Sequence, residues 1–391
     1  MEAATGRRVH VARTLDEVER LGSLWDAVPW EREEAEREYL LTRLRYRPEG
    51  ATPFAAVVTD GDEPAAAVAG RLETRPLETH VGYRNVYAPR LRLLQLVDGG
   101  IVAARPDALA PLRAALRGAL DRGEADALLV PPLPVGSELA EMFASLGGPL
   151  ERQRAIAPWT RRRLVLPATF EEFVASRSSN TRWRIRRDAK RLRAAYGEEL
   201  SVEIVRDPGG LERFVRDAER VADATYQRAL GAGFADTPEQ RELARLGLER
   251  GWVRGYLLRH GERPIAYWLC STYRGRLLIR STGFDQAYAE HRVGLHLLMR
   301  VIEDACADPL LEVVDFGPGD AVYKQQFSSE SFEERNQVVF AATLRGRRVN
   351  ATRAAILGSA RGARRALDTL RLTDRVRSGW RGRLRGTRLD G

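Results

Sequence analysis

The sequence contains very few cysteines and almost no lysine. Its 391 residues include only Cys270 and Cys306, which excludes a disulfide-stabilised scaffold and a cysteine-rich zinc site and is typical of a reducing cytoplasm. Lys190 and Lys324 are the only lysines, beside 61 arginines. An arginine bias of this size is typical of a GC-rich genome, so arginine abundance does not by itself indicate nucleic-acid binding.

The sequence also lacks long apolar segments and metal-binding patterns. No run of about 18 uncharged apolar residues occurs, so no membrane-spanning helix is expected. The first twenty residues have no apolar stretch after their basic residues, which argues against a secretory signal and favours a cytoplasmic location. His291 and His296 are five residues apart, whereas a helical zinc pair needs a spacing of four, so we expect no metal site.

Positive charge is concentrated at the end of the chain. The net charge is +9, yet residues 343–391 hold 14 arginines against three acidic residues, and the rest of the chain sums to −2. Apolar residues recur at helical spacing among these arginines: Ile356, Ala360, Ala363, Leu367 and Leu370. This pattern permits a helix lying on an anionic membrane surface, which would make the protein peripheral at the inner membrane. The alternative is a solvated or flexible appendage.

The length and the order of the expected elements predict two similar units. Each half shows helices, an antiparallel set of strands, a helix, a short apolar strand and a further helix, with hairpin turns at residues 61–62, 260–261 and 274–275. We therefore predict a mixed α+β fold of two tandem units, each a mostly antiparallel twisted sheet flanked by helices. The predicted boundaries are residues 1–167, 168–344 and a basic tail over 345–391. A strand near residues 163–166 is expected to close the first unit, and a strand over 337–344 the second.

The segment over residues 279–327 carries the clearest chemical signal. A strand leads into a polar loop, and the loop meets a helix near Arg292 and Gly294. The first turn of a helix leaves backbone N–H groups unpaired, and its dipole favours an anion there. Gly294 would let a phosphate approach the backbone, and Arg292 adds charge and a donor fork. The pattern therefore suggests a diphosphate site, although glycine near a helix start is also common for structural reasons.

A family resemblance gives this segment a context. The run Asp315-Phe316-Gly317-Pro318-Gly319, followed by Tyr323-Lys324, comes after an antiparallel set of strands and the phosphate-binding helix. This arrangement resembles the GNAT superfamily of acyl-CoA N-acyltransferases, and within it the tandem-domain CelD-like branch that is related to the Fem peptidyltransferases. An arginine-rich helix over residues 177–193 is similar to the one that opens the second domain of that branch. The resemblance covers residues 170–342 well and residues 10–165 only by architecture.

The resemblance implies acetyl-CoA as co-substrate and assigns roles to particular residues. The CoA diphosphate would lie over Arg292, Val293, Gly294, Leu295 and His296. Tyr323 would protonate the departing thiolate, a kind of proton transfer typically worth about 10²–10⁴ in rate, while Gly317 and Gly319 would shape the loop. The sequence departs from the fuller family pattern, since the spacing from Arg292 is one residue shorter and His296 replaces a small residue.

The amine acceptor needs a group that removes a proton. A lysine-like amine has a pKa of about 10.4 and must be deprotonated before it attacks. Asp315 is the first candidate for this base, with Asp285, His291 and Asp320 as others. The alternative is that Asp315 only holds Lys324 or backbone N–H groups of the loop. Lys324 is counted with Tyr323 and Asp315 at the catalytic site, because a chain that otherwise uses arginine retains a compact ammonium there.

These observations favour an N-acyltransferase that moves an acetyl group from acetyl-CoA to an amine. The acceptor would be a small molecule or precursor, such as an amino sugar or another cell-envelope or exopolysaccharide precursor. The first unit lacks a comparable phosphate site, so we expect it to be non-catalytic and to shape the acceptor cleft. Two alternatives remain: a Fem-like transferase that uses aminoacyl-tRNA, which is the one case in which nucleic acid is expected as a partner, and a non-catalytic scaffold at the membrane surface.

Overall fold

The computed structural model describes residues 7–47, 50–82, 84–153, 156–225 and 234–369. The helices are α1 (Leu15–Asp26), α2 (Arg37–Arg45), α3 (Leu109–Asp121), α4 (Glu138–Ala144), α5 (Phe170–Ala175), α6 (Ser179–Tyr196), α7 (Leu211–Asp223), α8 (Pro238–Glu249), α9 (Val293–Ala307), α10 (Val322–Phe327) and α11 (Leu344–Thr369). The strands are β1 (Arg7–Ala12), β2 (Thr52–Asp60), β3 (Glu63–Pro76), β4 (Thr79–Val81), β5 (Arg84–Tyr87), β6 (Arg90–Ala103), β7 (Ala127–Pro134), β8 (Trp159–Val165), β9 (Leu200–Val205), β10 (Val253–His260), β11 (Arg263–Tyr273), β12 (Arg276–Phe284), β13 (Val313–Pro318) and β14 (Glu330–Phe340).

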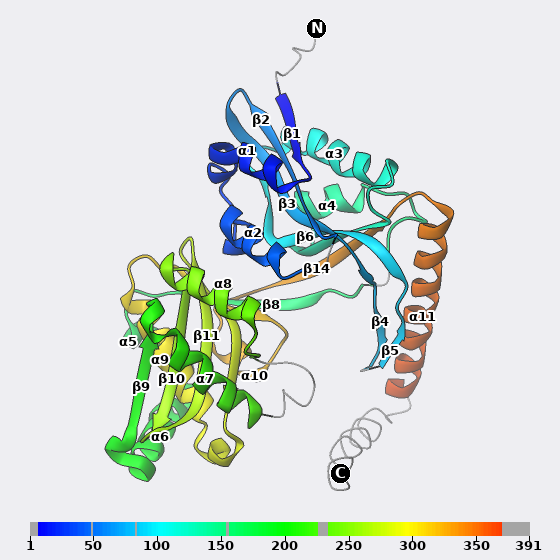
Figure 1. Cartoon of the computed structure of the whole chain (residues 1–391). Coiled ribbons are helices and arrows are strands. Elements are labelled where there is room, and N and C mark those ends of the chain that lie inside the picture. The colour runs from blue at the N-terminus through cyan, green and yellow to red at the C-terminus, as the bar shows by residue number, and fades with distance from the viewer. Residues whose placement is uncertain (1–6, 48–49, 83, 154–155, 226–233, 370–391) are drawn as a thin grey trace.

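Two helix-flanked halves share one long sheet (Figure 1). The strand order is β1-β2-β3-β6-β7-β14-β8-β13-β12-β11-β10-β9, and neighbours are antiparallel except β6–β7 and β12–β13. Along β2, alternate side chains enter different cores, because successive residues of a strand point to opposite faces. Phe54 packs on the α3 and α4 side, whereas Ala55 packs with the cluster of α1 and α2. The predicted α+β fold with mostly antiparallel strands is confirmed.

The two strands at the centre of the sheet are exchanged between the halves. β8 pairs with β13 of the second half, and β14 pairs with β7 of the first half as well as with β8. The expectation that the strand near residues 163–166 closes the first unit and the last strand closes the second is therefore wrong. Local patterns predict that a strand exists but do not fix its partner, which long-range packing decides. The boundaries at residues 167 and 344 remain predictions.

The predicted hairpins form at glycine-containing turns. β2 meets β3 around Gly61, and β10 meets β11 around Gly261. Between β11 and β12, Arg274 and Gly275 both have positive φ angles, 45° and 74°, the backbone that a two-residue hairpin loop needs to match strand twist. These turns place β12 beside β11 and direct its carboxyl end toward the start of α9.

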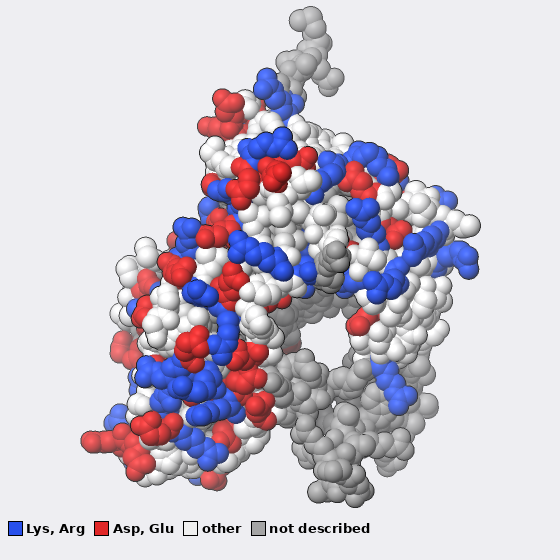
Figure 2. Space-filling view, in the orientation of Figure 1, with Lys and Arg blue, Asp and Glu red and all other residues white. Residues whose placement is uncertain are grey.

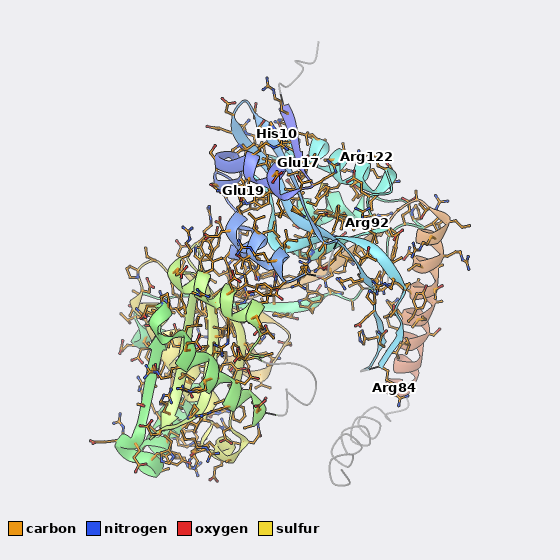
Figure 3. The ribbon with its side chains drawn as sticks, viewed as in Figure 1. His10, Glu17, Glu19, Arg84, Arg92 and Arg122 are labelled. Carbon is orange, nitrogen blue, oxygen red and sulfur yellow. The ribbon has the colours of Figure 1, made fainter. Side chains whose placement is uncertain are left out.

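The first part of the basic tail is a packed helix. α11 lies along the hairpin formed by β4 and β5 (Figure 1), and Figure 3 shows Arg84 at the far end of that hairpin. Val349, Asn350 and Arg353 are buried; the Asn350 amide donates to backbone carbonyls of Leu150 and Arg152, 2.8 and 3.1 Å away. Residues 344–362 are therefore a helix anchored on the first half and not a flexible appendage, while most of their side chains face solvent. Arg353 also anchors this helix: its guanidinium donates to carbonyls and side chains of residues 77–79 and 153, far away in the sequence, so helical periodicity does not reveal them. Leu370 and the rest of the tail lie outside the described residues.

Removal of α11 tests this packing. A chain ending at Thr343 loses the buried Val349, the Asn350 contacts and the Arg353 anchor, so we expect its unfolding free energy to fall by about 2–4 kcal/mol. Chemical denaturation measures the loss. A chain ending at Thr369 keeps all of these contacts and serves as the control; equal stability of the two truncated chains would contradict the anchoring role.

Charge of both signs covers the folded halves. On the face shown in Figure 2, basic and acidic side chains are interspersed over the two halves of the sheet, in agreement with the near-neutral composition outside the tail. Among the helices that the structure describes, none combines the length and the apolar character that crossing a membrane requires.

Candidate acyl-donor site

The start of α9 presents unpaired backbone donors. Arg292 precedes the helix in a left-handed conformation with φ of 52°, and its carbonyl accepts from the N–H groups of Leu295 and His296 at 2.9 and 3.0 Å. The N–H groups of Val293 and Gly294 have no acceptor among the described residues. Two amides that point out of a helix start, where the dipole is positive, suit an anion.

The side chains of the predicted diphosphate residues point in different directions. Arg292 is exposed, and its Nη1 lies 3.5 Å from Asp188 Oδ2, whereas Val293 is fully buried in the core. His296 lines a separate cavity between α6, β9 and α9. Burial and the nearby Arg300 lower the pKa of His296 to about 4, so its imidazole is neutral at physiological pH. The structure thus leaves the predicted phosphate contacts to backbone amides and to Arg292.

Trp268 joins the start of α9 to Tyr323. Its indole N–H donates to the Gly294 carbonyl at 3.1 Å, and its ring lies edge-on to the Tyr323 ring with centroids 6.1 Å apart. A Cβ on Gly294 would lie 3.2 Å from the Phe284 ring, so a side chain there would be crowded. Trp268 is not among the residues that sequence patterns single out, because only the packing of β11 against α9 reveals its position.

Tyr323 is a protonated phenol at every physiological pH. The side chain is half-buried, with Phe316 edge-on to its ring, and its hydroxyl has no hydrogen-bond partner among the described residues. Burial raises the pKa of Tyr323 to about 12. A phenol that keeps its proton and is not engaged by a neighbour is able to donate it to a departing thiolate.

Asp315 is buried in an ion-pair network instead of facing a cleft. Its side chain is fully buried and accepts from Arg161 Nε at 2.9 Å, from Arg163 Nε at 3.3 Å and from the Gly317 N–H at 2.9 Å. Burial opposes ionisation, but the charge and hydrogen bonds of Arg161 outweigh it and hold the pKa of Asp315 below its usual range. This geometry favours the alternative interpretation, in which Asp315 holds the backbone of the loop, over proton removal.

Lys324 holds the loop after β13 closed. Its ammonium donates to the carbonyls of Gly317 and Pro318, 3.2 and 2.6 Å away, and the side chain is buried. Gly317 and Gly319 have positive φ angles of 70° and 92°, which bring those carbonyls to one side. A compact ammonium with three donors suits two adjacent carbonyls, in keeping with a lysine at this position of an arginine-rich chain. Lys324 therefore supports the backbone that carries Tyr323.

Sequence analysis also missed two ion-pair clusters that join the halves. Arg161, on the exchanged strand β8, binds Asp315 on β13 and, at 3.0 Å, Glu334 on β14. Arg280, on β12, lies 2.8 Å from Glu33, and Glu34 also contacts it. These partners are between 150 and 250 residues apart in the chain, so no local pattern could have indicated them.

The buried carboxyl group of Glu33 should make the free energy of unfolding depend on pH. Burial, followed by the charge of Glu34, raises the pKa of Glu33 to about 7. The folded protein then keeps the proton that the unfolded chain loses near pH 4.5, so Glu33 makes the fold less stable as pH rises from about 4.5 to 7. Replacing it by glutamine should leave stability nearly unchanged at pH 4.5 and raise it by up to about 3 kcal/mol at pH 8. Denaturation at both pH values measures this; an equal effect at both would refute it, and exposed Glu38→Gln is the control.

The comparisons with known proteins place this site in a family domain. Residues 179–325 match the family model described as acetyltransferase (GNAT) domain. The match begins with α6, includes the start of α9, and ends directly after Tyr323 and Lys324. Residues 179–325 form a GNAT acyltransferase domain. The predicted GNAT resemblance is confirmed over this segment.

The fold of one solved structure is similar beyond the GNAT domain. The crystal structure of FemX is similar with a TM-score of 0.59 at 11% identity, over 83% of this chain and 96% of that one. A tandem GNAT protein from the clavulanic acid biosynthesis pathway has a TM-score of 0.47 at 14% identity, over 86% and 99% of the two chains. No curated protein matches the sequence. Within the described part of the chain, no three His, Cys, Asp or Glu residues are grouped so that they could hold a metal ion.

Proposed function

We propose that the protein is an N-acyltransferase that transfers an acetyl group from acetyl-CoA to an amine. The observation that carries the proposal is the pair of unpaired amides at Val293 and Gly294, joined through Trp268 to the protonated phenol of Tyr323. The amine attacks the thioester carbonyl, the carbon–sulfur bond breaks, and Tyr323 gives its proton to the CoA thiolate. Backbone N–H groups near the open end of β12 stabilise the oxyanion in the transition state.

The proton acceptor for the amine is a separate group from Asp315. Asp315 is fully buried and Asp285 is paired with Arg263 at 2.6 Å, so neither carboxylate is free to reach an incoming amine. Asp320 pairs with Arg162 at 2.6 Å on the surface. His291 remains from the sequence candidates; it is half-buried one residue before Arg292, and within the described part of the chain its ionic partner is Glu290. We therefore assign proton removal to His291, directly or through water.

The acceptor class and the location extend the same proposal. We place the enzyme in the cytoplasm, acting on an amino sugar or another precursor of the cell envelope or of exopolysaccharide, with the basic C-terminal segment near anionic membrane lipids. A Fem-like transferase that uses aminoacyl-tRNA is the second candidate, because the fold similarity to FemX extends over both halves. A non-catalytic scaffold would not need a free phenol beside the donor amides.

Thermal-shift measurements with a panel of acyl-CoAs test the donor. Acetyl-CoA at saturation should raise the melting temperature, and thiol release should follow when an amine is added. A shift with charged tRNA but none with any CoA would favour the Fem-like candidate. Absence of both shifts would favour the scaffold.

Arg292 allows donor binding to be separated from stability. Replacing Arg292 by glycine removes a phosphate-binding charge and also relieves a left-handed backbone that disfavours other residues by about 1 kcal/mol. We expect acetyl-CoA affinity to fall about three- to tenfold while the unfolding free energy stays the same or rises. Arg274→Gly is the matched control, because Arg274 is the other described non-glycine residue with positive φ; it should gain stability without losing affinity. Unchanged affinity in Arg292→Gly would remove this arginine from the donor site.

A further inference from the structure

The first half of the sheet opens into a cavity where two parallel strands separate. β6 and β7 pair over only three residues, as β12 and β13 do in the GNAT domain. Beyond the last pair, a cavity of about 780 Å³ lies between Leu96 of β6 and Val130 of β7. The cavity therefore lies where the only parallel pair described in the first half of the sheet stops pairing.

Arginines from three separate elements line this cavity. They are Arg43 and Arg47, in and after α2, Arg71 and Arg75 on β3, and Arg353 on α11. The arginines of α2 and β3 form ion pairs with two carboxylates that lie outside the cavity wall. Glu73 lies 3.2 and 2.9 Å from the Nε atoms of Arg71 and Arg75, and Glu239 lies 3.2 and 2.6 Å from Arg43 and Arg47.

The fifth arginine has no acidic partner in the described part of the chain. Arg353 is 7% exposed and donates to the carbonyls of Leu77 and Glu78, to the Thr79 hydroxyl and to the Gln153 side chain. The cavity therefore keeps an excess of three positive charges over the two shared carboxylates.

The acidic residues in the cavity wall do not remove this excess. Glu34 is engaged by Arg280, and Asp98 lies 2.7 Å from Arg32. Burial lowers the pKa of both Arg71 and Arg353, and the positive charges of Arg47 and Arg43 act in the same direction on Arg71. Guanidinium groups bind phosphate oxygens through paired hydrogen bonds, and several converging from different elements suit a multiply charged anion better than one carboxylate.

We propose that this cavity binds a phosphate-bearing part of the acceptor, so that the first half selects the molecule that the GNAT domain acylates. The assignment of the ligand as an acceptor rests on the proposed function, whereas the phosphate site rests on the arginines alone. Gln95, which accepts from Arg71 at 3.1 Å and from Arg75 at 2.7 Å, fixes the two guanidinium groups side by side at the cavity wall.

Calorimetric titration of the full chain without acyl donor tests the site. Inorganic pyrophosphate and inorganic phosphate distinguish a diphosphate from a phosphate monoester, and citrate tests whether a polycarboxylate binds equally well. We expect saturable binding of one of the phosphates that weakens with salt and falls at least tenfold in Arg75→Gln and in Arg353→Gln. Arg186→Gln, in the separate basic cavity beside α6, is the matched control and should bind as the wild type does.

Several outcomes would overturn the phosphate site. They are the absence of saturable binding, equal binding of citrate, and equal weakening in Arg186→Gln. Circular dichroism shows whether the buried Arg353→Gln variant folds. If it does not, Arg75→Gln still tests the site, because the Arg75 side chain is 36% exposed and its replacement should not prevent folding.

Acyl transfer to paired acceptors separates this inference from the proposed function. An amino sugar phosphate should show a KM at least tenfold lower than the same amino sugar without phosphate, and Arg75→Gln should remove the difference. Pyrophosphate binding without any acyl transfer would overturn the proposed function and leave the site standing. Transfer with equal KM for both amines, together with no pyrophosphate binding, would overturn the site and leave the function standing.

Discussion

Replacing Arg161 by alanine is expected to destabilise the folded protein by about 3–5 kcal/mol. The change leaves Asp315 and Glu334 buried without their shared cation, and an uncompensated buried charge is far more costly than the loss of a surface ion pair. Because Arg161 joins three strands at the centre of the sheet, the loss should appear in one transition that involves both halves. Chemical denaturation followed by circular dichroism measures it.

Arg162→Ala is the matched control for this prediction. Arg162 is the next residue on the same strand, and it pairs with Asp320, which is 44% exposed. Exposed pairs contribute roughly 0–1 kcal/mol. The deficit of Arg161→Ala should also shrink at low pH, where protonation neutralises the stranded carboxyl groups. Similar losses in the two variants would mean that the central ion pairs do not hold the halves together.

Replacing Tyr323 by phenylalanine should lower turnover about 10²–10⁴-fold while leaving acetyl-CoA binding nearly intact. The hydroxyl makes no hydrogen bond to a described residue, so its removal should change the unfolding free energy by no more than about 0.5 kcal/mol. Since the pKa of Tyr323 is about 12, the wild-type rate should show no loss from phenol ionisation as pH rises to 10. Steady-state rates, followed by thiol release over this pH range, measure both effects.

Tyr46→Phe provides the control for loss of a phenol at a distance. The Tyr46 hydroxyl contacts Glu242 at the contact between α2 and α8, away from α9, so this variant should keep its turnover. Equal activity of Tyr323→Phe and wild type would exclude the tyrosine as proton donor and leave thiolate release to water or to the backbone amides.

Sequence patterns predicted the elements around the donor site because those elements are encoded locally. Strand alternation, the turn at residues 274–275 and the glycine at the start of α9 each concern neighbouring residues. The Asp315-to-Lys324 motif likewise predicted a strand, a loop and a short helix in their observed order. What the motif could not distinguish is a carboxylate that reacts from one that supports a loop, because that depends on Arg161, which is 154 residues away.

The arginine-lined cavity could not be predicted from the sequence either. Sixty-one arginines made each single one uninformative, so the cations that converge from α2, β3 and α11 could not be separated from the many on the surface. Burial distinguishes them: Arg71 and Arg353 are each 7% exposed. The cavity of the first half is formed where β6 and β7 separate and where α11, from far along the chain, packs against them.

The exchange of β8 and β14 has a consequence during synthesis. When the first half has emerged from the ribosome, the backbone groups along one edge of β7 are still unpaired. Their partner strand, β14, comprises residues 330–340, which are synthesised later. The partners of β8 are β13 and β14, so neither half can complete its hydrogen bonding before residues 330–340 have been synthesised. Unpaired strand edges invite association between chains. The nascent protein should therefore depend on holding chaperones, and an isolated N-terminal fragment should aggregate unless the missing strand is supplied in trans.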